Sequence, residues 1–393
     1  MIKRDISKEL IQSAGEYPVV TVLGPRQSGK TTLVRMTFPN KTYFSLEDPD
    51  VRMVAETDPR GFLGQIEEGG ILDEVQRVPE LLSYLQGMID KSKKRGRFIL
   101  TGSHQPKLQE AINQSLAGRT AMLTLWPFSL NELRHYNSAP DPFELIVHGC
   151  FPRLYEEKLN SRRFFNGYLQ TYVERDVRTL IQLHDLSQFQ RFLILLAGRV
   201  GQIVNLSSLS NDVGVSSTTI RNWISVLKAS YIIFEVPPFF ENIRKRVVKS
   251  PKIFFTDVGL TSFLLGIATA EQAYRDPLRG NLYENLIIAE IVKGAFINGF
   301  RPEIYFFRDS HGNEVDLLIR EKGVIIPIEI KSATTFTSNF IKGLKQIQKL
   351  RIKKITPGSI LYNGEKKFNV EGIQVFNPFH VKNIWKTLVA PFE

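Results

Sequence analysis

The segment from Gly24 to Thr31 has the spacing G-x-x-x-x-G-K-[ST], which places a lysine and a hydroxyl group directly after a glycine-containing loop. Glycines let a backbone curl so that its N–H groups point inward at phosphate oxygens. Lys30 can then reach the β- and γ-phosphates of a nucleoside triphosphate, and the Thr31 hydroxyl can bind Mg²⁺. The motif therefore predicts a site for ATP and Mg²⁺. Its expected binding residues are Gly24, Pro25, Arg26, Gln27, Ser28, Gly29, Lys30, Thr31 and Thr32.

Polar residues at the ends of two short apolar runs extend this site. Asp73 ends the first run and is expected to hold Mg²⁺ through water, while Glu74 is expected to orient the water that attacks the γ-phosphate. The second run is followed by Ser103, which we interpret as the residue that senses the γ-phosphate, with Thr101 as the alternative. Arg119 is the candidate transition-state arginine, in cis or from a neighbouring subunit, which would require a homo-oligomer. The alternative for Arg119 is a surface salt bridge.

The last third of the chain carries a second set of residues suited to phosphate chemistry. Residues 303–331 predict a three-stranded meander, in which Glu329 and Lys331 share one face and Asp316 lies on the middle strand. This order is similar to the PD-(D/E)xK nuclease signature, although the proline is missing. In such nucleases the acids hold one or two Mg²⁺ ions and the lysine stabilises developing charge. The alternative is a retained fold that binds DNA or partners without cutting.

Glu284 adds a further acid to this set. It lies at helical spacing with Ile287, Ile288 and Ile291, so that it occupies an apolar stripe. An unpaired carboxylate is costly to bury there. We therefore expect Glu284 to face a metal ion or the lysine.

Residues 206–231 predict a helix-turn-helix, followed by a wing up to Phe255. The second helix would bury an apolar stripe and leave a polar face outside, suited to DNA. The wing is rich in cations, which bind phosphate backbones in a salt-dependent way. The alternative is a winged helix that only packs domains together. The candidate nucleic-acid contacts are Thr218, Thr219, Arg221, Arg244, Lys245, Arg246 and Lys249.

These residues need a frame of alternating strands and helices. Short β-branched runs at 19–23, 43–46, 71–73 and 98–101, with helical stretches between them, predict an α/β fold with a parallel sheet. After residue 128 the pattern becomes mainly helical, and strand patterns return from Tyr305. The expected domains are 1–135 for the phosphate-binding domain, 136–200 for a helical extension, 201–270 for the winged helix and 271–393 for the nuclease-like α/β domain.

Composition limits the classes of protein. The 393 residues are 42% hydrophobic and 23% charged, which is typical of a globular chain with a core. The single cysteine, Cys150, fits a reducing compartment, and no run of about 18 apolar residues could span a membrane. We therefore expect a cytoplasmic protein. The net charge of +11 favours an anionic partner such as DNA.

Several segments together resemble prokaryotic AAA-type ATPases of the additional-strand (ASCE) class that carry a C-terminal domain of unknown function, DUF4143. The resemblance rests on residues 23–33, 73–76, 100–103, 115–119, 172–177 and 249–253. It implies an ATPase core, a winged-helix segment and a restriction-endonuclease-like C-terminal domain.

Overall fold

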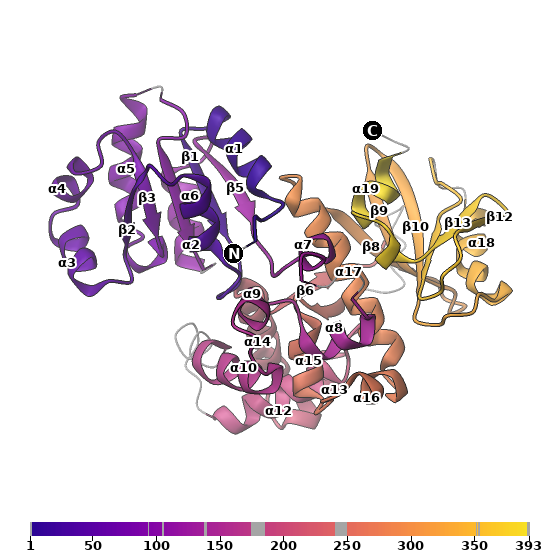
Figure 1. The fold of residues 1–393 in the computed structure, drawn as a ribbon. Helices are drawn as coiled ribbons and strands as arrows, with labels where there is room; N and C mark the ends of the chain where they lie inside the picture. The colour runs from indigo at the N-terminus through magenta and orange to yellow at the C-terminus, as the bar shows by residue number, and fades with distance from the viewer. Residues whose placement is uncertain are drawn as a thin grey trace. The chain divides into compact units, whose positions relative to one another are not determined.

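The computed structural model describes residues 2–92, 94–103, 106–136, 140–173, 185–239, 250–350, 352 and 354–390. The chain forms two compact units (Figure 1). The first contains residues 1–128 with 229–231 and 296–300, and the second contains the remaining residues. The predicted wing cations Arg244, Lys245, Arg246 and Lys249 lie outside the described residues.

A five-stranded parallel sheet forms the centre of the first unit, in the order β2-β3-β4-β1-β5. Its strands are β1 (Val19–Leu23), β2 (Thr42–Ser45), β3 (Gly70–Asp73), β4 (Phe98–Gly102) and β5 (Thr120–Thr124). β4 separates β1, which leads into the glycine loop, from β3, which ends in the acid pair. This inserted strand confirms the α/β fold and the additional-strand arrangement expected from the sequence.

Both faces of this sheet are buried, which explains why its strands read as continuous apolar runs. Val20, Val22 and Ile71 belong to a core with residues of α1 (Ser7–Glu16) and α2 (Lys30–Thr37). Val19 and Leu72, whose side chains alternate with these along the strands, belong to the opposite core. The helices that contribute to or border that second core are α3 (Pro49–Thr57), α4 (Pro59–Gly64), α5 (Leu81–Asp90) and α6 (Pro106–Ser115), with the 3-10 turn η1 (Val75–Arg77).

The second unit begins with short helices. They are α7 (Leu130–Leu133), α8 (Pro142–His148), α9 (Pro152–Glu156), α10 (Ser161–Tyr168) with the π-helical turn η2 (Leu169–Val173), α12 (Leu186–Ala197), α13 (Leu206–Val213), α14 (Ser217–Ala229), α15 (Val258–Leu264) and α16 (Ala270–Arg275). Gly214 ends α13 in the left-handed region, at φ +84°. The Ser216 hydroxyl accepts a hydrogen bond from the Thr219 N–H (3.0 Å) at the start of α14. An antiparallel pair of strands, β6 (Ile233–Val236) and β7 (Lys252–Phe255), follows.

A six-stranded mixed sheet completes the second unit, in the order β12-β13-β11-β10-β9-β8. The long helix α17 (Arg279–Ile297) precedes it. The predicted meander is present as β8 (Glu303–Arg308), β9 (Glu314–Glu321) and β10 (Val324–Lys331), all antiparallel. The later elements are η4 (Ser338–Ile341), α18 (Lys342–Lys349), β11 (Ser359–Tyr362), β12 (Phe368–Val370), β13 (Ile373–Phe376), η5 (Pro378–His380) and α19 (Ile384–Val389).

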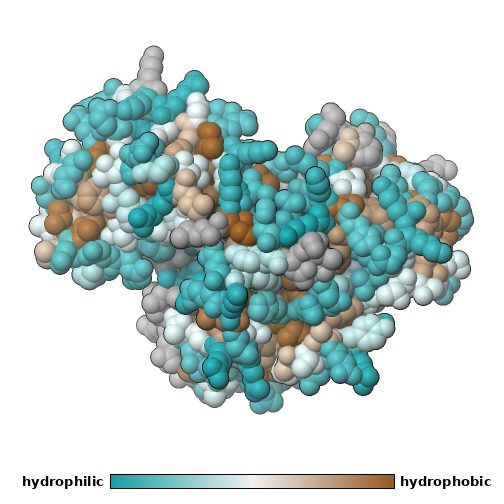
Figure 2. Space-filling view, viewed as in Figure 1, coloured by the Kyte–Doolittle hydropathy of each residue, from teal (hydrophilic) through white to brown (hydrophobic). Residues whose placement is uncertain are grey.

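The face of the molecule in Figure 2 is mostly hydrophilic, with apolar residues scattered over it. Among the described residues, Met53 is the most exposed large apolar side chain, at 61%. Of the helices in the described part of the chain, none combines the length and apolar character that crossing a membrane would require.

Candidate functional site

The glycine loop joins β1 to α2 and curls back over its own lysine. Gly29 adopts φ +90° directly before the helix, and a Cβ on Gly24 would lie 2.1 Å from the Leu125 carbonyl oxygen. Both positions therefore need glycine. The Lys30 ammonium group donates to the carbonyl oxygens of Gly24 (3.2 Å) and Pro25 (2.9 Å), so that it points into the loop.

Arg4 fixes this loop, a role that the sequence did not predict. Its guanidinium donates to the carbonyl oxygens of Ser28 (2.7 Å) and Trp126 (2.8 Å). It also lies 4.9 Å from the ring centroid of Phe128. Arg4 is 8% exposed, so these bonds are shielded from water and tie the loop to the segment after β5.

The Asp73 carboxylate accepts hydrogen bonds from three hydroxyl groups. Thr31 (2.7 Å) and Tyr43 (2.8 Å) donate to its Oδ2 atom, and Thr101 donates to Oδ1. The donors come from α2, β2 and β4, whose ends meet at the carboxyl edge of the sheet. Thr31 and Asp73, the two residues that the sequence assigns to Mg²⁺ at this site, thus lie in direct contact. Tyr43 was missed, because an aromatic residue in a short strand normally indicates packing.

Glu74 follows Asp73 in a left-handed backbone conformation (φ 58°, ψ 42°). Such a conformation is unusual for a residue with a side chain and is often found at functional sites. The Gln76 amide donates to the Glu74 carboxylate. A Cβ on Gly102 would lie 2.6 Å from Oε1 of Gln76, so this glycine leaves space for the amide. Gln76 is a positioning residue for Glu74 that the sequence did not single out.

Two buried hydroxyl groups beside the loop have no partner among the described residues. Ser28 is fully buried within the loop, and Ser103 is 5% exposed just after β4. Buried hydroxyls are normally hydrogen-bonded, so an unpartnered one indicates a polar group that binds there. Thr101, the alternative to Ser103, already donates to Asp73. Together with Lys30 and Thr31, these groups fit a magnesium-bound nucleotide.

Arg119 does not approach this site within its own chain, which excludes the cis role; instead it forms a surface salt bridge, the alternative that the sequence left open. It precedes β5 at the amino edge of the sheet, because Val19 pairs with Thr120 while the loop follows Leu23. With about 3.3 Å per residue, the two edges are roughly 13–16 Å apart. Arg119 forms a forked ion pair with Asp90, with distances of 2.7 and 3.0 Å.

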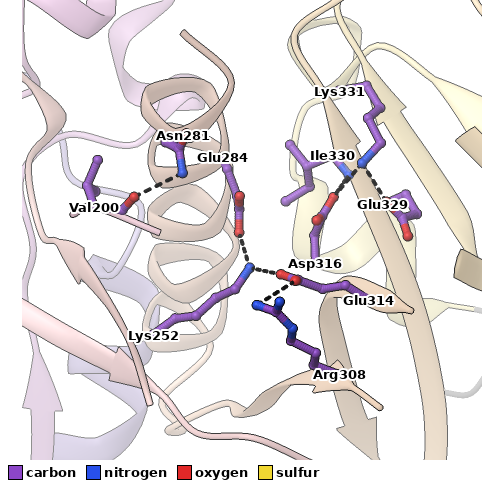
Figure 3. Close-up of polar contacts among 10 residues, drawn as sticks. All are labelled: Val200, Lys252, Asn281, Glu284, Arg308, Glu314, Asp316, Glu329, Ile330 and Lys331. Carbon is purple, nitrogen blue, oxygen red and sulfur yellow. Dashed lines mark hydrogen bonds and ion pairs between the residues drawn. The ribbon is translucent and has the colours of Figure 1, made fainter. Parts of the chain in front are cut away.

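A second polar centre lies in the C-terminal sheet, where Asp316, Glu329 and Lys331 meet as the sequence predicted. The Lys331 ammonium group donates to Asp316 Oδ2 (3.0 Å) and Glu329 Oε2 (2.6 Å). Asp316 also accepts the Ile330 N–H (2.8 Å) across the antiparallel strands. Figure 3 shows Lys331 between the two acids.

Glu284 pairs with a different lysine from the one that the sequence suggested. Lys252 of β7 lies between Glu284 Oε1 (3.1 Å) and Glu314 Oε1 (2.6 Å), as Figure 3 shows. Glu314 also faces Arg308 at 3.7 Å. Lys252 lies in the segment up to Phe255 that the sequence assigns to the wing. The one local feature that could have indicated its burial is its position directly before the apolar run 253–255.

Comparison with known protein families divides the chain into three matched segments. Residues 16–134 match the AAA domain, and residues 279–381 match a domain of unknown function, DUF4143. Residues 140–271 match another domain of unknown function, DUF8612. The chain combines a P-loop AAA-type ATPase domain with a DUF4143 domain.

Relatives of similar sequence match over most of this chain. Uncharacterized proteins of Mycobacterium tuberculosis and Mycobacterium bovis are each 29% identical over 383 residues, which cover 96% of this chain and 83% of theirs. An uncharacterized protein of Haemophilus influenzae is 21% identical over 84% of this chain and 86% of its own length. Among solved structures, a Walker-type ATPase of Pyrococcus abyssi matches with 15% identity and a TM-score of 0.45, covering 66% of this chain and 94% of its own.

Burial sets the protonation of the DUF4143 acids. It raises the pKa of Glu284 to about 8, with Asp316 and Glu314 adding to the rise and Lys252 opposing it. Burial and the neighbouring Asp316 also raise the pKa of Glu329 well above its usual range. Burial acts in the same direction on Asp316, but the charges of Lys331 and Lys252 outweigh it and lower the pKa. The charges of the two lysines thus favour the ionised form of Asp316 despite its burial.

These acids do not fit a metal ion in the present arrangement. Each carboxylate of the cluster already contacts an ammonium group, Lys331 for Asp316 and Glu329, and Lys252 for Glu284 and Glu314. Within the described ranges, no group of three or more His, Cys, Asp or Glu side chains is placed to hold a metal. The predicted metal ligands Asp316 and Glu329 thus lie together but are bound to a lysine.

Gly343 provides a test of how tightly this centre is packed. A Cβ there would lie 2.2 Å from Glu329 Oε1 and 2.4 Å from the Glu314 carbonyl oxygen. Because the backbone cannot yield cheaply, we expect Gly343→Ala to lower the free energy of unfolding by about 1–3 kcal/mol. Chemical denaturation of the full chain measures this change.

Gly167→Ala is the matched control, since it makes the same substitution in helix α10, where nothing lies within 4 Å of the added Cβ. Alanine favours a helix over glycine by about 0.8–1 kcal/mol, so this variant should be no less stable than the wild type. Equal stability of Gly343→Ala and Gly167→Ala would contradict the close packing around Glu329.

Proposed function

We propose that the AAA domain binds ATP with Mg²⁺ at residues 24–32 and hydrolyses it. The observation that carries this proposal is the contact between the Thr31 hydroxyl and Asp73 at 2.7 Å. It joins the end of the glycine loop to the acid pair across the inserted strand β4, which is the arrangement that a magnesium-bound triphosphate needs.

Each residue has a separate task in this proposal. Lys30 would exchange its loop carbonyls for the β- and γ-phosphates, and Thr31 and Asp73 would hold Mg²⁺, which would supply charge neutralisation at the phosphates. Glu74, oriented by Gln76, accepts a hydrogen bond from the attacking water. Ser103 donates its free hydroxyl to the γ-phosphate. Arg119 can serve only the site of a second copy, which would require a homo-oligomer.

Substitutions of Glu74 and Lys30 should affect ATP hydrolysis and ATP binding separately. We expect Glu74→Gln to retain ATP binding but to lower kcat by at least about 100-fold, the usual contribution of a positioned base. Lys30→Ala should weaken ATP binding by about tenfold or more, because it removes a charged hydrogen-bond donor. Calorimetric ATP titration and a phosphate-release assay measure the two effects. Turnover by Glu74→Gln at the wild-type rate would refute the assignment of the base.

A second proposal is that the chain engages DNA through the segment that follows α12. The helix pair α13–α14 and the hairpin β6–β7 have the order of a winged helix-turn-helix. The apolar stripe of α14 is buried, at Ile220, Trp223, Ile224 and Leu227, whereas Thr218 and Arg221 are exposed and Thr219 is half-exposed. With the net charge of +11, this face suits a phosphate backbone.

Arg221 tests this face. If it contacts a phosphate, Arg221→Ala should weaken DNA binding and reduce the slope of log K against log salt concentration by about one. Fluorescence anisotropy with labelled duplex and single-stranded DNA measures the slope. Arg162→Ala, which removes an exposed arginine from α10, is the control and should leave the slope unchanged. Identical slopes for all three proteins would exclude this use of α14.

Phosphodiester cleavage by the DUF4143 domain is a second candidate activity, which the convergence of Asp316, Glu329 and Lys331 favours. We expect any Mg²⁺- or Mn²⁺-dependent cleavage of plasmid DNA to be lost in Asp316→Ala and Lys331→Ala. Glu74→Gln, which leaves the DUF4143 domain intact, should still cut. If the wild type cuts no DNA with either metal, the domain is a binding module and the chain is an ATP-gated switch for DNA or a protein partner.

A further inference from the structure

Lys252 is buried and its ammonium group is flanked by two acids, which is unusual for a lysine. The residue is 3% exposed, and its ammonium group contacts Glu284 and Glu314 and lies 5.5 Å from the Phe306 ring centroid. A buried ammonium group is stable only when acids and hydrogen bonds compensate for its lost hydration. The carboxylates have the same need, so each side of the pair requires the other.

The lysine and the acids come from different parts of the second unit. Lys252 lies on β7, in the segment that matches DUF8612, whereas Glu284, Glu314 and Asp316 lie in the DUF4143 segment. Backbone hydrogen bonds hold the two parts in register. Phe239 N donates to the Phe306 carbonyl oxygen (2.7 Å), and Phe306 N donates to that of Pro237 (3.0 Å).

A cavity of about 350 Å³ adjoins this ion pair. Lys252, Glu284 and Glu314 line it together with Asn281 and Arg308. The Asn281 amide donates to the Val200 carbonyl oxygen (3.1 Å), so it is fixed in place (Figure 3). The acids are therefore accessible to a small ion from this side, but one oxygen of each already contacts the ammonium group.

We propose that Lys252 is the resident counter-ion of Glu284 and Glu314, so that these two acids hold its ammonium group in place of a divalent cation. The DUF8612 segment then supplies the counter-ion of acids in the DUF4143 domain. Which cation these acids hold does not depend on whether the domain cuts DNA or the AAA domain hydrolyses ATP.

Titration of Mn²⁺ into chelator-treated, nucleotide-free full-length protein tests this proposal. We expect Lys252→Ala to take up one Mn²⁺ more than the wild type, with an affinity at the new site at least about tenfold above any wild-type binding there, because no ammonium group competes for the oxygens. Mn²⁺ should also raise the unfolding temperature of Lys252→Ala relative to EDTA, but not that of the wild type.

Two controls locate the effect. Lys252→Ala/Glu284→Gln removes the buried acid as well and should lose both the extra Mn²⁺ and its stabilisation. Lys228→Ala removes the lysine of the more exposed Lys228–Glu235 pair and should behave as the wild type. All these proteins share the same glycine loop, so metal bound in the AAA domain cancels in the comparison.

The proposal is overturned if Lys252→Ala takes up no more Mn²⁺ than the wild type, or if the extra uptake survives Glu284→Gln. If Lys252→Ala does not fold, Lys252→Gln keeps most of the length and a hydrogen-bond donor without the charge, and the same outcomes apply. A comparison of the wild type with the single variant Glu284→Gln tests the proposal without either Lys252 variant. An equivalent of Mn²⁺ bound by the wild type and lost in Glu284→Gln would show that a metal is the resident cation.

Discussion

The carboxylate of Asp73 is the contact on which the arrangement of the AAA domain depends. Hydroxyl groups from α2, β2 and β4 converge on its two oxygens. This is possible only because parallel strands bring their carboxyl ends to one edge of the sheet, with β4 inserted between the loop strand and the acid strand. A single buried acid thereby fixes the distance between the glycine loop and Glu74.

The DUF4143 domain also buries carboxylates, but ammonium groups face them there instead of hydroxyl groups. Acids on α17, β9 and β10 lie close together, and burial alone would force them to take up protons, as the raised pKa values of Glu284 and Glu329 show. Lys331 and Lys252 supply the compensating charge, one from the same sheet and one from β7. The two lysines keep Asp316 ionised even though it is buried.

The main elements of both units were predictable because their patterns are local. Four of the five strands of the AAA domain, the helix pair α13–α14 and the meander β8–β10 were each placed within two residues of their observed ends. Glu329 and Lys331 share a face for the same reason, since strand side chains alternate. In contrast, β5 and the strands β11, β12 and β13 were not predicted individually, and the local pattern around Arg119 does not indicate which edge of the sheet it occupies.

The sequence by itself determined the phosphate loop, the acid pair and the order of the DUF4143 acids, because spacing along a strand or helix fixes which side chains point the same way. Only the tertiary structure decided that Arg4 anchors the loop, that Tyr43 donates to Asp73 and that Lys252 rather than a metal ion faces Glu284. These partners are distant in sequence, and no periodicity records which distant charge a buried carboxylate meets. Packing between segments determines the contact, because the free energy lost by burying an unpaired charge exceeds the conformational preference of either residue.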